Sequence, residues 1–312
     1  MFGHKKEKKT DRPLAAPGGD KLGVYIHIPF CKSKCDYCDF YSLAGREDQM
    51  DRYQKALLSH IAETAPMAQV PVDTIYFGGG TPSLYGEKRL KEILTALKKQ
   101  LPVDKDAEIT LEANPDSAGD WKELRTLRRC GFNRLSLGMQ SADDEELSEI
   151  GRVHTMAQTE AAVEAARKAK FQNLSLDLIY GLPHQTLEGW QKNLSAALDL
   201  TPEHLSCYGL KVEEGTPLFA RRGTAGLPGD DAQADMYLYT VEFLKAQGYE
   251  QYEISNFAKP GCASRHNLKY WTLGEYAGFG PGAHSDFGGR RYSFVRDLDR
   301  YIDGVLKGGG II

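Results

Sequence analysis

The stretch Leu22-Gly-Val-Tyr-Ile-His-Ile-Pro-Phe30 runs directly into Cys31-Lys-Ser-Lys-Cys35-Asp-Tyr-Cys38. Its first part is a short apolar run with β-branched residues, which is typical of a buried strand. Its second part places three cysteines in the segment that follows, with the spacing C-x3-C-x2-C. Because ligands of α/β folds bind at the carboxyl ends of the strands, these cysteines are candidates for the chemistry of the protein.

Strand and helix patterns alternate from this point onward. We predict strands at 22–30, 72–77, 107–113, 134–139, 174–180 and 204–212. The helices that follow them are predicted at 46–64, 87–101, 120–129 (ending at Gly131), 187–198 and 230–247, and the fourth strand is followed by two helical segments, at 143–150 and 158–170. Six strand–helix pairs in this order favour an α/β fold with a parallel sheet, curled into a partial (β/α)6 barrel by right-handed crossovers.

The composition divides the chain into three expected parts. Residues 1–20 mix Lys, Pro, Gly and Asp without hydrophobic period, and we expect a mobile leader there. Residues 21–249 form the predicted barrel core. Residues 250–312 are rich in glycine, aromatic residues and histidine, and are expected to add a C-terminal layer. The final Gly308-Gly309-Gly310-Ile311-Ile312 does not resemble the end of a natural domain, so we expect this layer to be truncated.

Charge and hydropathy exclude several classes of protein. The 312 residues are 41% hydrophobic and 26% charged, with a net charge of −4, which excludes predominant disorder and disfavours a globally basic nucleic-acid binder. No apolar run is long enough to span a bilayer, and the charged first residues are not followed by a signal-type apolar segment. We therefore expect a cytoplasmic protein that does not bind nucleic acid, whose cysteines serve metal binding or catalysis.

Cys31, Cys35 and Cys38 are the candidate metal ligands. A 4Fe–4S cluster normally takes four cysteines, so three would leave one iron open to a substrate. The alternative is a zinc site completed by His27 or by a distant cysteine, since structural zinc usually has four ligands. The isolated cysteines, which we interpret as small buried side chains, are Cys130, Cys207 and Cys262.

The segment from Tyr25 through Cys38, with an aromatic residue before the last cysteine, resembles the radical S-adenosylmethionine superfamily. The resemblance implies that the open iron binds the amino and carboxylate groups of S-adenosylmethionine. Reduction of the cluster would then cleave this cofactor to methionine and a 5′-deoxyadenosyl radical. The cofactor supplies the difficult chemistry, and the protein orients and shields it.

The same resemblance assigns residues after the other strands to cofactor binding. Tyr25, Tyr37, Gly79 and Glu112 would surround S-adenosylmethionine, with Glu112 accepting the ribose hydroxyl groups. The positions that correspond to a second S-adenosylmethionine in porphyrin-related relatives are Gly80, Thr81, Gln140, Arg152, Asp177 and Lys211. A structural alternative for Arg152 and Asp177 is an ion pair at the barrel rim.

Two branches of the superfamily share these motifs. The first is the oxygen-independent coproporphyrinogen III oxidases, which decarboxylate a porphyrin precursor and carry a further cysteine where this chain has Phe40. The second is the HemW-type haem chaperones, whose H-N-x-x-Y-W signature matches His266-Asn-Leu-Lys-Tyr270-Trp271. In that branch the histidine is associated with haem, and an imidazole is a good axial ligand for haem iron. His284 is a second candidate ligand.

The sequence therefore favours the chaperone branch, with the oxidase as the alternative. The implied cofactors are a 4Fe–4S cluster, S-adenosylmethionine and haem, with His266 as the leading haem contact. The implied partners are haem and an acceptor protein, with a membrane-associated acceptor as one option. Catalytic residues and the use of radical chemistry stay unassigned at this point.

Overall fold

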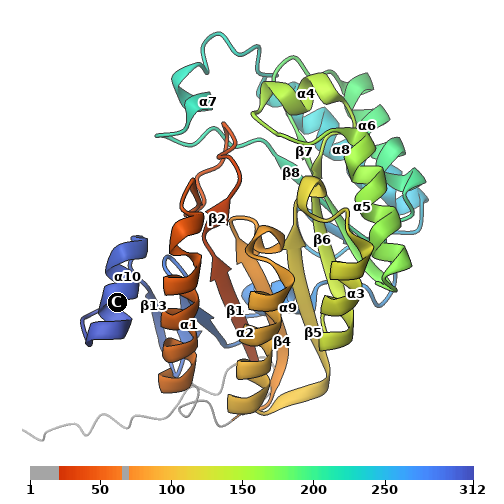
Figure 1. Cartoon of the computed structure of the whole chain (residues 1–312). Helices are drawn as coiled ribbons and strands as arrows, with labels where there is room; N and C mark the ends of the chain where they lie inside the picture. The colour runs from red at the N-terminus through yellow and green to blue at the C-terminus, as the bar shows by residue number, and fades with distance from the viewer. Residues whose placement is uncertain (1–20, 65–69) are drawn as a thin grey trace, which may run out of the picture.

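The computed structural model describes residues 21–64 and 70–312, so the leader predicted at 1–20 lies outside the described residues (Figure 1). Parallel strands form the centre of one large sheet, as the alternation predicted. These strands are β1 (Leu22–Ile28), β4 (Val72–Gly79), β5 (Val103–Ala113), β6 (Arg134–Gln140), β7 (Asn173–Tyr180) and β8 (His204–Gly209).

Helices connect these strands, and α1, α2 and α3 lie side by side along one face of the sheet (Figure 1). The helices as far as β9 are α1 (Met50–Thr64), α2 (Glu87–Gln100), α3 (Trp121–Cys130), α4 (Asp144–Glu149), α5 (Met156–Lys168), α6 (Leu187–Asp199), α7 (Pro217–Ala220) and α8 (Asp230–Ala246), with short 3-10 turns at Glu47–Gln49, Pro82–Tyr85 and Pro115–Ser117. Helix α3 ends at Gly131, whose φ of 123° suits glycine, as predicted. No helix in the described ranges combines the length and the apolar character needed to cross a bilayer.

The predicted partial (β/α)6 barrel is confirmed. The strand order is β13-β12-β11-β1-β4-β5-β6-β7-β8-β10-β9, and every neighbouring pair from β1 to β8 is parallel. Strand β8 is shorter than the predicted 204–212, because its pairing with β7 ends where Tyr180 meets Gly209. The following Lys211 is exposed and pairs with Glu213 in the loop beyond the strand.

Alternation along the strands separates an apolar face from a polar one. Side chains such as Ile26, Phe77 and Leu111 pack in the hydrophobic core under the helices. Their neighbours along the strands line a polar cavity on the other face, as Tyr25 and Glu112 illustrate. Successive residues of a strand point to opposite faces, so one strand can serve both the core and a ligand site.

The chain after residue 249 extends the same sheet at both edges. On one side β9 (Glu250–Gln251) and β10 (Asn256–Ala258) join β8. On the other side β11 (Tyr276–Phe279) pairs in parallel with β1, and the antiparallel strands β12 (His284–Phe287) and β13 (Arg290–Ser293) follow. This part of the chain also contributes two helices, α9 (Arg265–Trp271) on the polar face of the sheet and α10 (Leu298–Lys307) against α1.

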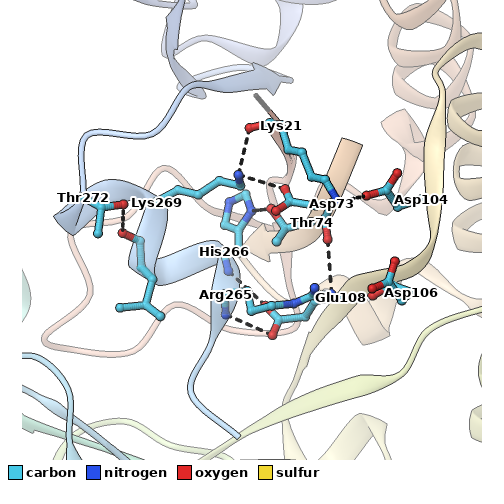
Figure 2. A network of polar contacts seen from close by, with 11 residues as sticks. Lys21, Asp73, Thr74, Asp104, Asp106, Glu108, Arg265, His266, Lys269 and Thr272 are labelled. Atoms are coloured by element: carbon cyan, nitrogen blue, oxygen red, sulfur yellow. Dashed lines mark hydrogen bonds and ion pairs between the residues drawn. The ribbon is translucent and has the colours of Figure 1, made fainter. Parts of the chain in front are cut away.

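Helix α9 carries the H-N-x-x-Y-W motif, and polar side chains of the sheet hold it in place (Figure 2). The carboxylate of Glu108 accepts hydrogen bonds from the backbone N–H groups of Arg265 and His266, both at 3.0 Å. At the other end of the helix, the Lys269 ammonium lies 2.8 Å from the Asp73 carboxylate. A carboxylate at the first N–H groups satisfies donors that have no partner within the helix, so strand β5 fixes where α9 begins.

Candidate functional site

The cysteine loop follows β1 and is partly exposed. Burial raises the pKa of the Cys31 and Cys38 thiols. The Thr81 hydroxyl donates to Cys31 Sγ at 3.5 Å, and the Arg152 guanidinium donates to Cys35 Sγ at 3.5 Å. The Thr81 hydrogen bond offsets part of the rise in the pKa of Cys31, whose thiolate is the form that binds metal.

Contacts with distant parts of the chain hold this loop. The Asp36 backbone N–H donates to the Ile150 carbonyl at 3.0 Å, and its carbonyl accepts from the Leu218 N–H at 2.9 Å. The Asp36 carboxylate also lies 3.1 Å from the Arg221 guanidinium, which pairs with Glu149 as well. Sequence reasoning missed Arg221, since nothing in its local sequence marks it as a support of the cysteine loop.

The donor set fits a cluster better than a zinc site completed by His27. The His27 Nε2 lies 2.8 Å from the Tyr41 carbonyl and its Nδ1 lies 3.1 Å from the Tyr25 hydroxyl, so both ring nitrogens are engaged. Within the described ranges, no three His, Cys, Asp or Glu side chains are grouped to share one metal ion. A cubane cluster instead takes each thiolate on a different iron, so its three cysteines need not converge on one point.

A polar cavity of about 220 Å³ lies on the face of the sheet that α9 covers. Its walls come from the inward-facing positions of the parallel strands and from the segment around α9. The lining residues are Tyr25, Tyr76, Glu112, Arg134, Ser136, Asp177, His204, Ser206, Tyr208, Tyr252, Asn256, Ser264, His266, Asn267 and Tyr270.

Glu112 lies half-buried in the wall of this cavity, on the carboxyl-terminal half of β5. Its Oε1 accepts from the Tyr76 hydroxyl at 2.6 Å and its Oε2 from the Gly79 N–H at 3.2 Å. Burial raises the pKa of Glu112 to about 7. A carboxylate has about four acceptor positions, so Glu112 keeps free lone pairs for the hydroxyl groups of a ligand.

We expect the affinity of the protein for S-adenosylmethionine to depend on the ionisation of Glu112. Below about pH 7 the carboxyl is protonated, so binding should tighten as the pH rises from about 6 to about 8, given its pKa of about 7. Glu112→Gln should weaken binding by roughly 1.5–3 kcal/mol and remove this pH dependence. Anaerobic calorimetry at several pH values measures both effects, and an unchanged affinity of Glu112→Gln at pH ~8 contradicts the assignment.

Gly80 was expected at the cofactor, and the structure shows that its backbone packs against β1 and β2 (Phe30–Cys31). A Cβ on Gly80 would lie 2.7 Å from the Phe30 carbonyl oxygen and 2.9 Å from that of Ile28. These are backbone atoms, which cannot turn away as a flexible side chain would. The glycine therefore allows the loop after β4 to approach the strand that leads into the cysteines.

Gly80→Ala should lower the free energy of unfolding by about 1–3 kcal/mol, the usual cost of overpacking. Gly119→Ala is the control, because a Cβ there meets no atom within 4 Å. Denaturant unfolding of the two variants and the wild type makes the comparison. Equal stability of Gly80→Ala and the wild type would show that this contact relaxes freely.

Arg152 links the cysteine loop to two neighbouring strand ends. Its guanidinium donates to Asn114 Oδ1 and to the Gly138 carbonyl, both at 2.9 Å, in addition to Cys35. Asn114 donates in turn to Thr81 Oγ1 at 3.2 Å. Thr81 and Arg152 are thus brought together at the cysteine loop.

The other expected residues occupy different places around this centre. Asp177 accepts from the Ser136 and Ser175 hydroxyls, so the alternative of a rim ion pair between Arg152 and Asp177 is wrong. Tyr37 packs against the small apolar cluster of Ile150, Ile179 and Leu182. Gln140 ends β6 with a φ of 65°. Lys211 is not brought to the site, because it lies exposed in the loop after β8.

His266 is 1% exposed and lies in the cavity wall. Its Nδ1 lies 2.9 Å from Thr74 Oγ1, and its Nε2 lies 2.9 Å from the Tyr270 hydroxyl. The imidazole stacks on Tyr76, with ring centroids 5.2 Å apart. Burial lowers the pKa of His266 to about 3, so the ring stays neutral near pH 7. His284, the second candidate, is exposed on β12.

Comparison with known proteins agrees with this site. The sequence profile of the Radical SAM superfamily matches residues 25–197, which span the cysteine loop and the strands as far as β7. A solved structure, described as "Coproporphyrinogen III oxidase (HemN) from Escherichia coli is a Radical SAM enzyme", superimposes with a TM-score of 0.82. The match is 28% identical and covers 94% of this chain and 71% of that one. The fold and the cysteine loop are those of a radical SAM protein.

Curated relatives identify the branch within this class. The heme chaperone HemW of Bacillus subtilis is 41% identical over 290 residues, which cover 92% of this chain and 76% of the relative. The heme chaperone HemW of Escherichia coli is 42% identical over 265 residues, which cover 84% of this chain and 69% of the relative. The chain belongs to the HemW family of the radical SAM superfamily.

Proposed function

We propose that this protein binds haem and passes it to an acceptor protein. The names of its relatives describe them as heme chaperones. The observation that carries the proposal is the position of the H-N-x-x-Y-W helix. It places His266 in the wall of a cavity whose other walls come from the barrel strands. A neutral buried imidazole is the form of histidine that ligates iron. The acceptor is a protein that the family function requires, and a membrane-associated acceptor is one option.

Three thiolates, from Cys31, Cys35 and Cys38, would hold the 4Fe–4S cluster of the superfamily. When bound, this cluster offers one iron to S-adenosylmethionine and an electron for its cleavage. The chain itself orients and shields the site: Arg152 and Thr81 donate to the cysteine sulfurs, and Glu112 offers acceptors to ribose hydroxyl groups. The other residues that we propose around S-adenosylmethionine are Tyr25, Tyr37, Gly79, Gly80, Gln140 and Asp177.

Haem binding through His266 requires one local rearrangement. The Tyr270 hydroxyl occupies the Nε2 of His266, and the Tyr270 side chain is 40% exposed. Rotation of this exposed ring toward solvent frees Nε2, while Nδ1 keeps its hydrogen bond to Thr74. We propose that the haem iron takes the place of the Tyr270 hydroxyl.

The competing function is radical decarboxylation of coproporphyrinogen III, which the likeness to the oxidase structure favours. Phe40 is 66% exposed and stands where oxidases carry a further cysteine. Anaerobically reconstituted protein should therefore shift the Soret band of added haem without converting coproporphyrinogen III in the presence of reductant and S-adenosylmethionine. Formation of protoporphyrinogen under these conditions would instead establish the oxidase function.

A further inference from the structure

Arg134, at the start of β6, is a buried cation that sequence reasoning did not single out. The residue is 2% exposed and lines the polar cavity. Its Nε is buried without a hydrogen-bond acceptor, and its guanidinium forms no hydrogen bond or ion pair with any described residue. Arginine cannot lose its proton in a protein, so a full charge and an unpaired Nε–H donor lie at the cavity wall.

The other polar groups of the cavity already have partners. Glu112 accepts from Tyr76 and Gly79, and Asp177 accepts from two serines. His204 lies within hydrogen-bond distance of Ser175 and of Tyr252 through its two ring nitrogens. Burial raises the pKa of both Glu112 and Asp177, and the positive charge of Arg134 lowers it in both. Among the described residues, the Arg134 Nε–H therefore has no acceptor.

We propose that Arg134 binds a carboxylate of the ligand, which is a haem propionate if the proposed function holds. A guanidinium offers parallel N–H donors that match the two oxygens of a carboxylate. The cavity volume of about 220 Å³ is below the ~300 Å³ typical of a site that encloses a whole drug-sized ligand. A side arm fits inside, and the macrocycle then lies at the mouth, where Tyr208 and Tyr270 are 43% and 40% exposed.

The first experiment changes the ligand and leaves the protein intact. Wild-type protein is titrated with haem and with haem dimethyl ester, in which both propionates are neutral. We expect haem to bind about 10- to 100-fold more tightly, the range that corresponds to one charge-assisted hydrogen bond. This comparison uses only the wild-type protein, so it does not depend on the folding of any variant.

The second experiment changes the protein. Arg134→Met keeps most of the side-chain volume and removes the charge, and it should bind haem and the ester with equal affinity. Arg129→Met is the matched control, because Arg129 is exposed on α3, and it should discriminate as the wild type does. Arg134→Lys keeps the charge without the planar fork and should retain part of the preference. The affinity for S-adenosylmethionine, whose own carboxylate is the competing source, is measured in the same variant. Because the Arg134 charge lowers the pKa of Glu112, any loss in Arg134→Met should be confined to the acid side of the Glu112 titration.

The outcomes separate this inference from the proposed function. Tight and equal binding of haem and the ester by the wild type overturns the role of Arg134, with water as the partner of the guanidinium, and leaves haem binding intact. Loss of S-adenosylmethionine affinity in Arg134→Met, with the haem preference retained, assigns Arg134 to the other carboxylate and also overturns it. Binding of neither ligand by the wild type overturns both proposals.

Discussion

Alanine in place of Cys31, Cys35 or Cys38 is expected to abolish the iron and the acid-labile sulfide that the wild type takes up on anaerobic reconstitution. The wild type should contain about four irons per chain, the content of a cubane cluster. One loop supplies all three thiolates, so the loss of any one leaves two, below the number needed to hold the cluster. Iron and sulfide analysis with absorption and electron paramagnetic resonance spectra measures the effect.

Cys130→Ala is the control for this experiment. Cys130 lies at the end of α3, outside the cysteine loop, and its loss should leave the iron content unchanged. Gly80 and Arg221 hold the loop from outside, so their variants should change the stability of the cluster without removing a ligand. Stoichiometric zinc without sulfide in anaerobically purified protein would contradict the cluster assignment.

His266→Ala is expected to remove the imidazole–iron signature from the spectrum of bound haem and to lower haem affinity. The reason is geometric, because His266 brings a neutral imidazole to the wall of the cavity. Tyr270→Phe should have the opposite effect and strengthen binding, since it removes the hydroxyl that occupies Nε2 at 2.9 Å. Titrations followed at the Soret band, with the iron in each oxidation state, measure both variants.

The affinity of the same variants for S-adenosylmethionine distinguishes a structural role of His266 from direct ligation of haem iron. His266 stacks on Tyr76, whose hydroxyl donates to Glu112. If the histidine acts only by positioning these groups, His266→Ala weakens S-adenosylmethionine binding and leaves the haem spectrum as in the wild type. His284→Ala is the control, because this exposed histidine should not change the spectrum. Identical spectra for the wild type and His266→Ala would count against ligation by His266.

Local sequence was sufficient for the scaffold and for naming the candidate metal ligands. Short apolar runs predicted the strands from β1 to β8, and helical periodicity predicted the main helices between them, to within a few residues. Each segment buries one face against the sheet, so its own sequence carries the period of a strand or of a helix. The three cysteines needed no tertiary information, since their spacing within one loop already places them together. The H-N-x-x-Y-W motif was recognised in the same way, as a continuous segment.

The polar interior of the site depended on pairings between residues far apart in the chain. The Arg152 guanidinium donates to Cys35 and does not pair with Asp177. Glu108 fixes the start of the helix that carries His266. Arg134 faces a cavity whose walls come from several strands and from α9. Local periodicity states which face of its own strand a side chain occupies. The register between strands and the docking of α9 decide which other side chain it meets there, and these arise only when the whole sheet forms.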